Sequence, residues 1–566
     1  MKTIMKTHLI FFAAIAATLP LHAEDTFWEP ATGTIDYGWS NRFNWNRVLP
    51  NSGDMVFINN SDISTRPVVN AGAEYAGLRM ATSQGDVAHL LLSYGGAMTN
   101  FSESCIIGVN GQAHFQQLGG SIFSRRFFIL GDQLGSEGFY QMSGGTYECD
   151  DWSVRIGNEG YGELKVLGGE FIMAKDDRHN MVGDAPTGVG RVEVYGGLLR
   201  SKQVGHFRVG NDGCGSLFVN GGTVQITGDM FVGYANQTQT SVVELRSGLL
   251  TAGWGMYVGY GGLGYFIAET NAMCRNLYVG YQASGHGVIR LEDAEITVHD
   301  DGQNAIIGDA GYGELVLSNG ILRNITGARL TVRDKNTATG IIRGFGSVEG
   351  FKYTMINNGV VVADGFGEDQ ELFFTNNENE FCEVVTNTIP NVSTNGWYAR
   401  RGGKLTLPPL RMKGGWDHPY TYSWGASQYD SAPDLVNSLR VTVNSLEGGW
   451  AFMTASLLAP DRTDVPELPE GSNVLGIWDL RFTGPDSIGD CDLELRYDHT
   501  SVLSSAPLIR RYDTVSGKWL RLEAISLPDN RIRIENLQIE HISGNIYSPG
   551  LIAALVPREG TFFLLK

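Results

Sequence analysis

Cysteine and proline are scarce in this sequence, and acidic residues outnumber basic ones. The chain of 566 residues has only 6 cysteines and 18 prolines. No two cysteines form a CxxC pair, so zinc ribbons and dithiol redox motifs are not indicated. Lys and Arg number 42 against 61 Asp and Glu, which gives a formal net charge of −19. This balance argues against a nucleic-acid partner, because few cations are available to neutralise phosphates.

Long apolar runs and common catalytic motifs are also missing. Beyond the N-terminal leader no stretch is long and apolar enough to span a membrane, so we expect no transmembrane segment in the mature chain. No Gly-x-Ser-x-Gly elbow, HExxH motif or Walker loop occurs. The sequence therefore identifies no catalytic residue, and it favours a protein that is not an enzyme.

Residues 1–23 have the features of a secretory signal peptide. Lys2 and Lys6 precede an apolar stretch, and the small residue Ala23 ends a plausible cleavage site. We therefore expect an exported protein whose mature chain begins near Glu24.

Glycine, by contrast, is abundant, with 74 residues spread along the chain. An apolar residue followed by glycine recurs at intervals of roughly 21 to 28 residues, a period typical of solenoid repeats. A Gly-x-Gly, an alternating strand and a Gly-Gly turn follow several copies, as in RIGNEGYGELKVLGGEF. In that segment Leu164 and Val166 should face the core, with Glu163 and Lys165 outside. The repeat glycines are Gly108, Gly131, Gly157, Gly183, Gly210, Gly233, Gly259, Gly280 and Gly308.

These repeats predict an all-β fold. Each unit holds two or three short strands and is too small to bury its apolar side alone, so units should coil on one another. We expect a parallel β-helix, a solenoid of about ten coils. The first four cysteines fall at four different repeat positions, so buried free thiols are favoured over disulfides or metal ligands.

One repeat contains a Gly-His-Gly at residues 285–287, and Asp300-Asp301 follows it. Polygalacturonases, which are β-helix enzymes, use a Gly-His-Gly and paired aspartates in their active sites. Aligned on Gly-x-Gly, however, His286 occupies a slot that holds Tyr161, Val189, Cys214, Leu263 or Tyr312 in other repeats. The glycines serve a turn, and the aspartates follow the motif where that family's precede it. The match therefore gives little support to such an enzyme.

Stacked coils turn repeat positions into columns on the surface. The residue two places before each repeat glycine should point outward, which predicts an exposed aromatic ladder of Phe231, Tyr257 and Tyr278. Arg208 precedes this ladder in the same column. A sugar ring or a partner protein could stack on such a surface. Alternatively, other segments cover the rings, or the rings simply stabilise the sheet.

Two further columns suggest polar or metal sites. Beside the ladder, a column of His179, His206 and Asp229 could hold a divalent metal, although a surface hydrogen-bonding column is favoured. Two acidic turns one repeat apart should lie close together, and Ca²⁺ could relieve their repulsion. Lys202 on the next coil could neutralise them instead. These acidic turns are Asp150-Asp151 and Asp176-Asp177.

Composition divides the chain further. After the leader, residues 24–70 contain three tryptophans and suit a cap that closes the first coil. Residues 71–374 carry the predicted β-helix, and residues 375–396 form a polar linker or a last irregular coil. From 397 to 566 the strands alternate without the glycine motif, which indicates a C-terminal antiparallel β-sandwich-like region.

The W…NW…P…GD spacing of the cap, followed by VGxxGxGxLxVxGG repeats, resembles exported β-helix proteins of Gram-negative bacteria. That group includes autotransporter passenger domains and surface proteins with sorting tails, of pectin-lyase-like architecture. The resemblance implies a secreted or cell-surface structural and adhesive protein that binds a polysaccharide or a surface partner. The alternative is a polysaccharide lyase or glycoside hydrolase on the same fold. The chain departs from the group at its C-terminus, which has neither barrel-type strands nor a sorting signal, and its oligomeric state stays open.

Overall fold

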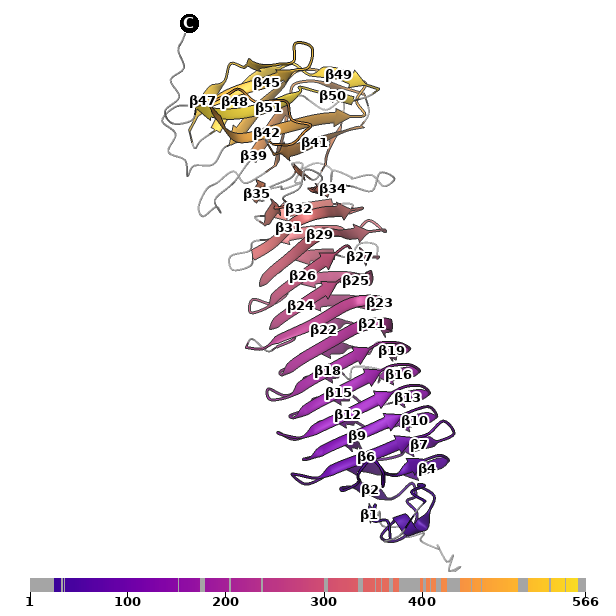
Figure 1. Cartoon of the computed structure of the whole chain (residues 1–566). Helices are drawn as coiled ribbons and strands as arrows, with labels where there is room; N and C mark the ends of the chain where they lie inside the picture. Colours follow the sequence, from indigo (N-terminus) through magenta and orange to yellow (C-terminus); the bar gives the residue numbers. More distant parts are fainter. Residues whose placement is uncertain are drawn as a thin grey trace, which may run out of the picture.

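The computed structural model confirms a parallel β-solenoid of about 12 turns, somewhat more than the predicted number, followed by antiparallel sheets. Figure 1 shows the coils stacked into a rod with the C-terminal sheets at one end. The structure describes residues 25–31, 34, 36–150, 152–173, 179–202, 205–235, 238–299, 304–333, 339–351, 353–357, 359–365, 370–375, 397–400, 404–407, 409–413, 419–424, 438–448, 450–459, 461–496, 507–528, 531–544 and 546–557.

Each coil contributes one strand to each of three parallel sheets. The strands of the first sheet mostly end at the repeat glycine. They are β1 (Asp25–Phe27), β2 (Met55–Ile58), β5 (Gly77–Met80), β8 (Cys105–Ile107), β11 (Phe128–Leu130), β14 (Val154–Ile156), β17 (Asn180–Val182), β20 (Phe207–Val209), β22 (Met230–Val232), β28 (Asn304–Ile307), β30 (Arg329–Arg333) and β32 (Tyr353–Asn357).

The second sheet holds the strands that start at Gly-x-Gly. They are β6 (Val87–Leu92), β9 (Gln112–Gln117), β12 (Glu137–Met142), β15 (Tyr161–Val166), β18 (Val189–Val194), β24 (Leu263–Ala268), β26 (His286–Glu292), β33 (Val360–Ala363) and β35 (Trp397–Arg400), with the short β3 (Val68–Val69) beside β6.

The third sheet follows the Gly-Gly turn. Its strands are β4 (Gly72–Tyr75), β7 (Ala97–Asn100), β10 (Ser121–Ser124), β13 (Thr146–Cys149), β16 (Glu170–Met173), β19 (Leu198–Ser201), β27 (Glu295–Val298), β34 (Glu371–Phe374) and β36 (Lys404–Thr406). Five longer strands bend from one sheet into the next: β21 (Cys214–Ile226), β23 (Thr240–Val258), β25 (Ala272–Val279), β29 (Tyr312–Asn324) and β31 (Thr339–Glu349).

Backbone geometry explains the glycine repeat. Gly157 has a φ of +72°, and a Cβ there would lie 2.2 Å from the carbonyl oxygen of Val189 on the next coil. A Cβ on Gly162, in the Gly-x-Gly, would lie 2.1 Å from the amide nitrogen of Gly157. Only glycine fits such a tight corner, so the motif specifies the corner between the first and second sheets.

The register confirms the alignment of the repeats. Leu263, His286 and Tyr312 are direct partners on successive coils. His286 therefore occupies a structural position that other side chain types occupy in the neighbouring coils. In β15, Leu164 and Val166 are fully buried while Glu163 and Lys165 lie outside, as predicted.

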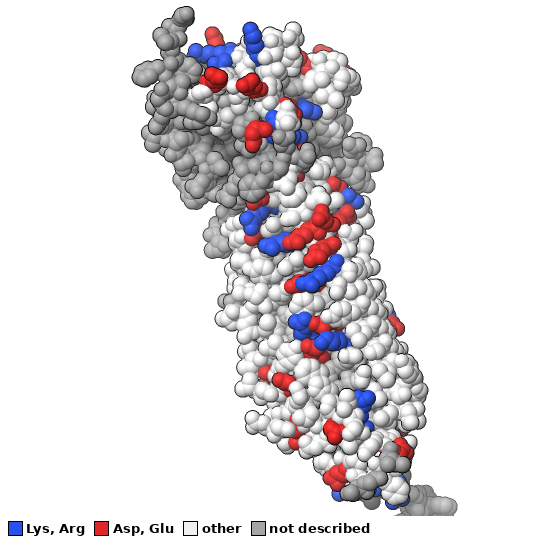
Figure 2. All heavy atoms as spheres, in the orientation of Figure 1, with Lys and Arg blue, Asp and Glu red and all other residues white. Residues whose placement is uncertain are grey.

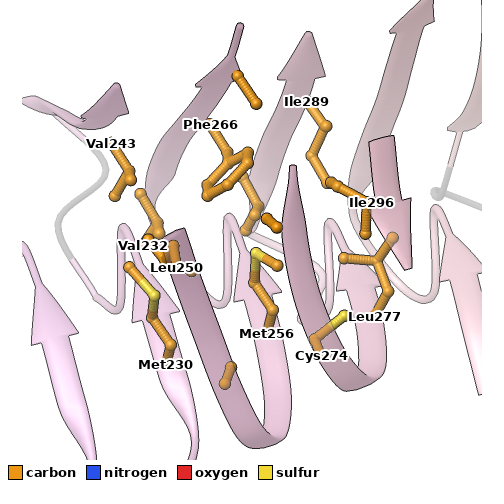
Figure 3. Packing of buried hydrophobic residues seen from close by; sticks show 14 of the residues in the cluster. Met230, Val232, Val243, Leu250, Met256, Phe266, Cys274, Leu277, Ile289 and Ile296 are labelled. Carbon is orange, nitrogen blue, oxygen red and sulfur yellow. The ribbon is translucent and has the colours of Figure 1, made fainter. Parts of the chain in front are cut away.

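Apolar side chains from all three sheets fill the interior of the rod. Figure 3 shows Met256 and Leu277 of the first sheet, Phe266 of the second and Ile296 of the third all pointing into the interior of the coils. The five cysteines within the described residues are free; Cys105, Cys149, Cys274 and Cys491 are buried and Cys214 is half-buried. The expected buried thiols therefore belong largely to this core.

Three tryptophans close the N-terminal end, near η1 (Arg42–Asn44). Trp28, Trp39 and Trp45 are buried, and the ring of Trp45 packs edge-on against both others at centroid distances of 5.0 and 4.8 Å. Parallel pairing nevertheless begins within this predicted cap, where β1 pairs with β2. At the other end it extends past residue 396, through β35 and β36.

The C-terminal region continues directly from the solenoid. Strand β36 pairs antiparallel with β41 (Trp450–Leu458), which starts an antiparallel sheet with β37 (Leu410–Lys413), β42 (Ser472–Thr483), β45 (Leu508–Asp513), β46 (Lys518–Arg521), β49 (Glu540–Ser543), β50 (Ile546–Ser548) and β51 (Leu551–Pro557). A second antiparallel sheet contains β38 (Tyr420–Trp424), β39 (Ser438–Val443), β44 (Cys491–Arg496), β47 (Ile525–Leu527) and β48 (Arg531–Leu537), and β40 (Leu446–Glu447) pairs with β43 (Ser487–Ile488).

Apolar residues of both antiparallel sheets belong to one continuous core, as expected for a sandwich-like arrangement. Within the described part of the chain, no helix is long and apolar enough to cross a membrane.

Candidate binding surface

The first aromatic ladder lies on the first sheet. Phe231, Tyr257 and Tyr278 are register partners on three successive coils. Their rings stack with centroids 4.9 and 4.7 Å apart and interplanar angles of 18° and 6°. In-register strands thus bring together three residues that are 21 to 26 positions apart in the sequence because each coil returns to the same column.

A second ladder, which the sequence analysis missed, runs beside the first. Tyr234, Tyr260 and Tyr281 each directly follow a repeat glycine, and their rings stack at 4.8 and 5.0 Å. Within a coil the two ladders meet edge to face, at 87° for Phe231 and Tyr234 and at 84° for Tyr278 and Tyr281. We call these six side chains the aromatic patch.

The second ladder corrects one expectation. Phe231 was predicted to be exposed, but its exposed fraction is only 8%. The rings of Tyr234 and Tyr260 lie against it at 5.3 and 5.2 Å and exclude water from it. Tyr257 and Tyr278 are half-buried. Because ring faces pack on one another along the rod, the patch presents mainly ring edges and phenol hydroxyls to solvent.

The phenols of Tyr257, Tyr260 and Tyr278 are neutral at physiological pH. Burial, and then the neighbouring carboxylate of Asp229, raise the pKa of Tyr257. Burial also raises the pKa of Tyr260 and of Tyr278. A neutral phenol can both donate and accept a hydrogen bond, so each hydroxyl suits a ligand that carries hydroxyl groups.

Arg208 borders the patch on its N-terminal side. Its guanidinium carbon lies 3.6 Å from the ring centroid of Tyr234, and its Nη1 donates to Asn211 Oδ1 at 2.8 Å. On the C-terminal side Asp309 pairs with Arg333 at 2.8 Å. The charged groups at both ends of the patch therefore have partners within the protein.

The predicted polar column lies next to Phe231. The backbone amide of Asp229 donates to Nδ1 of His206 at 3.0 Å, and Asp229 Oδ1 accepts from the amide of Gly255 at 2.8 Å. The rings of His179 and His206 are 5.4 Å apart. In the described residues, no three His, Cys, Asp or Glu side chains are arranged to hold a metal ion. The column of His179, His206 and Asp229 therefore has the geometry of a hydrogen-bonding column, which was the alternative to a metal site.

Trp254, also missed from the sequence, extends this surface. Its ring lies 6.0 Å from that of His206, and its exposed fraction is 42%. Unlike the stacked tyrosines, this indole has much of its surface open to solvent.

The proposed calcium ligands are only partly within the described residues. Asp150 accepts from Lys202 Nζ at 3.2 Å, and Glu148 pairs with the same lysine. Lys202 thus pairs with Asp150 in the structure, which was the alternative to a calcium ion at this turn. Asp151, Asp176 and Asp177 lie outside the described residues.

The second sheet carries a very different surface. Figure 2 shows acidic and basic side chains gathered along the face that carries this sheet in Figure 1. Lys165 Nζ lies 2.6 Å from Glu163 and 3.4 Å from Glu193, and Arg191 Nε donates to Glu193 at 2.7 Å. We call these four residues the ion-pair band.

The acidic and basic side chains of the ion-pair band neutralise one another. Burial opposes ionisation of Glu193, whose exposed fraction is 4%, but hydrogen bonds and the charges of Arg191 and Lys165 prevail and lower its pKa. A carboxyl group with a lowered pKa is a poor general acid.

No protein-family model matches the chain, and no curated protein matches it significantly. The surfaces described above are therefore the basis for inferring a function.

Proposed function

We propose that this chain is an exported structural and adhesive protein that uses the aromatic patch to bind an uncharged polysaccharide. The observation that carries the proposal is the pair of stacked ladders, which repeats the same edges and hydroxyls on three successive coils. Export is inferred from residues 1–23, which lie outside the described residues.

Regular spacing supports a polymeric ligand. Rings of the second ladder recur every 4.8 to 5.0 Å along the rod. A linear polysaccharide also repeats its hydroxyls and C–H groups at a regular interval, so successive sugars can make equivalent contacts. Aromatic edges with a polar tip suit such an amphipathic surface.

Local charge supports an uncharged ligand. Arg208 is held by Tyr234 and Asn211, and Asp229 lies on the border of the patch. With a net charge of −19, the protein as a whole would repel an acidic polymer.

The enzymatic alternative, a polysaccharide lyase or glycoside hydrolase, has less support. A glycosidase needs two carboxyl groups, one of them with a raised pKa. Glu163 and Glu193 are one acidic pair on the second sheet, but Lys165 bridges them and the pKa of Glu193 is lowered.

The proposal is tested by pull-down on insoluble neutral polysaccharides, with glycan arrays for soluble ones. The test variant is Tyr234→Ala/Tyr260→Ala/Tyr281→Ala, and the control is Tyr94→Ala/Tyr195→Ala, two exposed tyrosines elsewhere on the rod. We expect at least a ten-fold loss of binding in the test variant and none in the control.

Two outcomes would contradict the proposal. One is binding that survives in the test variant. The other is shortening of the polysaccharide chain by the wild-type protein, which would favour the enzymatic alternative.

A further inference from the structure

A half-open groove lies on the second sheet near the N-terminal end of the rod. It has a volume of about 290 Å³, at the lower limit for small-molecule sites. Its floor includes His89, His114 and Phe139, which are register partners on β6, β9 and β12. Their rings stack at 4.9 and 4.6 Å. Gln116 and Gln141 form the next column, two residues further along each strand.

A fixed loop, residues 59–67, forms one wall of this groove. Asp62 accepts hydrogen bonds from the amides of Ser64 and Thr65 at 2.7 and 2.9 Å. The loop is anchored to the sheet, because the amide of His89 donates to Ser61 Oγ at 2.8 Å. Ile63 and Arg66 of this loop line the groove, and Ile63 has an exposed fraction of 68%.

The groove differs from the coils above it in its unused hydrogen-bonding groups. In the same columns, Lys165 binds Glu163 and Glu193, and both Glu163 and Lys165 line the groove. Within the described part of the chain, no protein group hydrogen-bonds to the imidazoles of His89 and His114. The same holds for the side-chain amides of Gln116 and Gln141 and for the Arg66 guanidinium. All of these groups line the same groove, where a ligand could form hydrogen bonds with them.

The chemistry of these groups defines the ligand. Burial, then the charge of Arg66, lowers the pKa of His89, and burial, then His89, lowers that of His114. Both imidazoles are thus neutral at neutral pH and, like the two glutamines, can donate and accept hydrogen bonds. Arg66 supplies one cation, whereas Lys165 at the other end is neutralised by Glu163 and Glu193.

We propose that this groove binds an acidic sugar unit, a polyhydroxylated ring with one carboxylate. The carboxylate pairs with Arg66, and the hydroxyls bond to His89, His114, Gln116 and Gln141. Phe139 and Ile63 contact the C–H faces of the ring. This site goes beyond the proposed binding of an uncharged polymer, because it lies on a different sheet and takes a charged ligand.

The test is isothermal titration calorimetry with glucuronate, glucose and acetate as separate probes. We expect saturable binding of glucuronate, with glucose and acetate each at least about ten-fold weaker, since each lacks one set of contacts. Arg66→Gln should weaken glucuronate binding about ten-fold or more, because a charge-assisted bond is lost. Gln116→Ala/Gln141→Ala should weaken it by a smaller factor.

Arg246→Gln is the matched control, since Arg246 is an exposed arginine of the same sheet. It should bind glucuronate like the wild type, and so should the Tyr234→Ala/Tyr260→Ala/Tyr281→Ala variant. Absence of saturable glucuronate binding would overturn the proposal, as would equal affinity for acetate or full retention by Arg66→Gln. Loss of polymer binding by the tyrosine variant, with glucuronate binding kept, separates the two sites.

Discussion

The aromatic patch and the ion-pair band are built on the same scaffold in opposite ways. Both place side chains in register on successive coils, one on the first sheet and the other on the second. In the patch, aromatic rings stack on aromatic rings. Their faces therefore contact one another, and their hydroxyls remain at the surface. The band alternates acid and base, so its polar groups bind one another. The difference indicates that the patch has interactions left for a ligand and the band has few.

The same contrast recurs within the second sheet. The coils that form the floor of the groove carry neutral hydrogen-bonding side chains without partners among the described residues. On the next coils, acidic and basic side chains form ion pairs with one another. Regular stacking alone is therefore no evidence of a binding surface, and both proposed sites depend on hydrogen-bonding groups that face solvent.

The largest expected change in stability comes from breaking the band at Arg191. Arg191→Ala leaves Glu193, a nearly buried carboxylate, with the Lys165 ammonium and the Tyr195 hydroxyl. Because Arg191 is partly exposed and these partners remain, we expect a loss of about 2 kcal/mol in the free energy of unfolding rather than the full cost of orphaning a buried charge. Urea denaturation would measure this loss, and Arg246→Ala, at an exposed pair, should cost below about 0.5 kcal/mol. Equal effects of the two substitutions would refute the distinction.

A smaller change is expected at the centre of the patch. Tyr260→Ala removes two stacking contacts, to Tyr234 and Tyr281, which together contribute about 1–2 kcal/mol. Tyr260→Phe keeps the ring and should leave the unfolding midpoint nearly unchanged while weakening polysaccharide binding. If Tyr260→Phe binds as well as wild type, the Tyr260 hydroxyl has no part in recognition.

Acidic pH should reduce the contribution of the ion-pair band to the stability of the fold and leave that of the aromatic patch unchanged. The lowered pKa of Glu193 stabilises the fold above its unfolded value near 4.5, and this contribution disappears as the pH falls through the lower folded value. Tyrosines with raised pKa values act oppositely and matter only above pH 10.0. Thermal unfolding from pH 7 to pH 3 should therefore show a smaller acid-dependent loss in Glu193→Gln than in wild type. An identical loss would mean that other carboxyl groups dominate.

The smallest effect is expected at the acidic turn. Lys202 pairs with Glu148 and Asp150 in partly exposed positions, so Lys202→Gln should cost about 0.5 kcal/mol. Adding Ca²⁺ should not change the melting temperature of the wild type. A calcium-dependent rise would revive the metal site at Asp150.

The fold could be predicted from the sequence because its period is set by local geometry. A glycine at positive φ, such as Gly157, fixes each corner, and alternation in strands such as β15 fixes which side chains are inside. The first ladder followed from counting two positions back from the repeat glycine. The second could have been found the same way, since Tyr234, Tyr260 and Tyr281 occupy the position directly after it.

Other features depend on contacts that no repeat position encodes. Phe231 is buried because two rings from the neighbouring column cover it. The groove depends on residues 59–67, a loop in the predicted cap that Ser61 and Trp28 hold in place through bonds to His89 and Thr65. Such long-range placement needs the structure.

Hydroxyl-radical footprinting of the chain on a bound neutral polysaccharide tests the central claim most directly. We expect protection of Tyr234, Tyr260, Tyr281 and Trp254 when the polymer is present, with unchanged oxidation of the exposed Tyr94 and Tyr195. Protection of other aromatic residues, with these four unchanged, would contradict it.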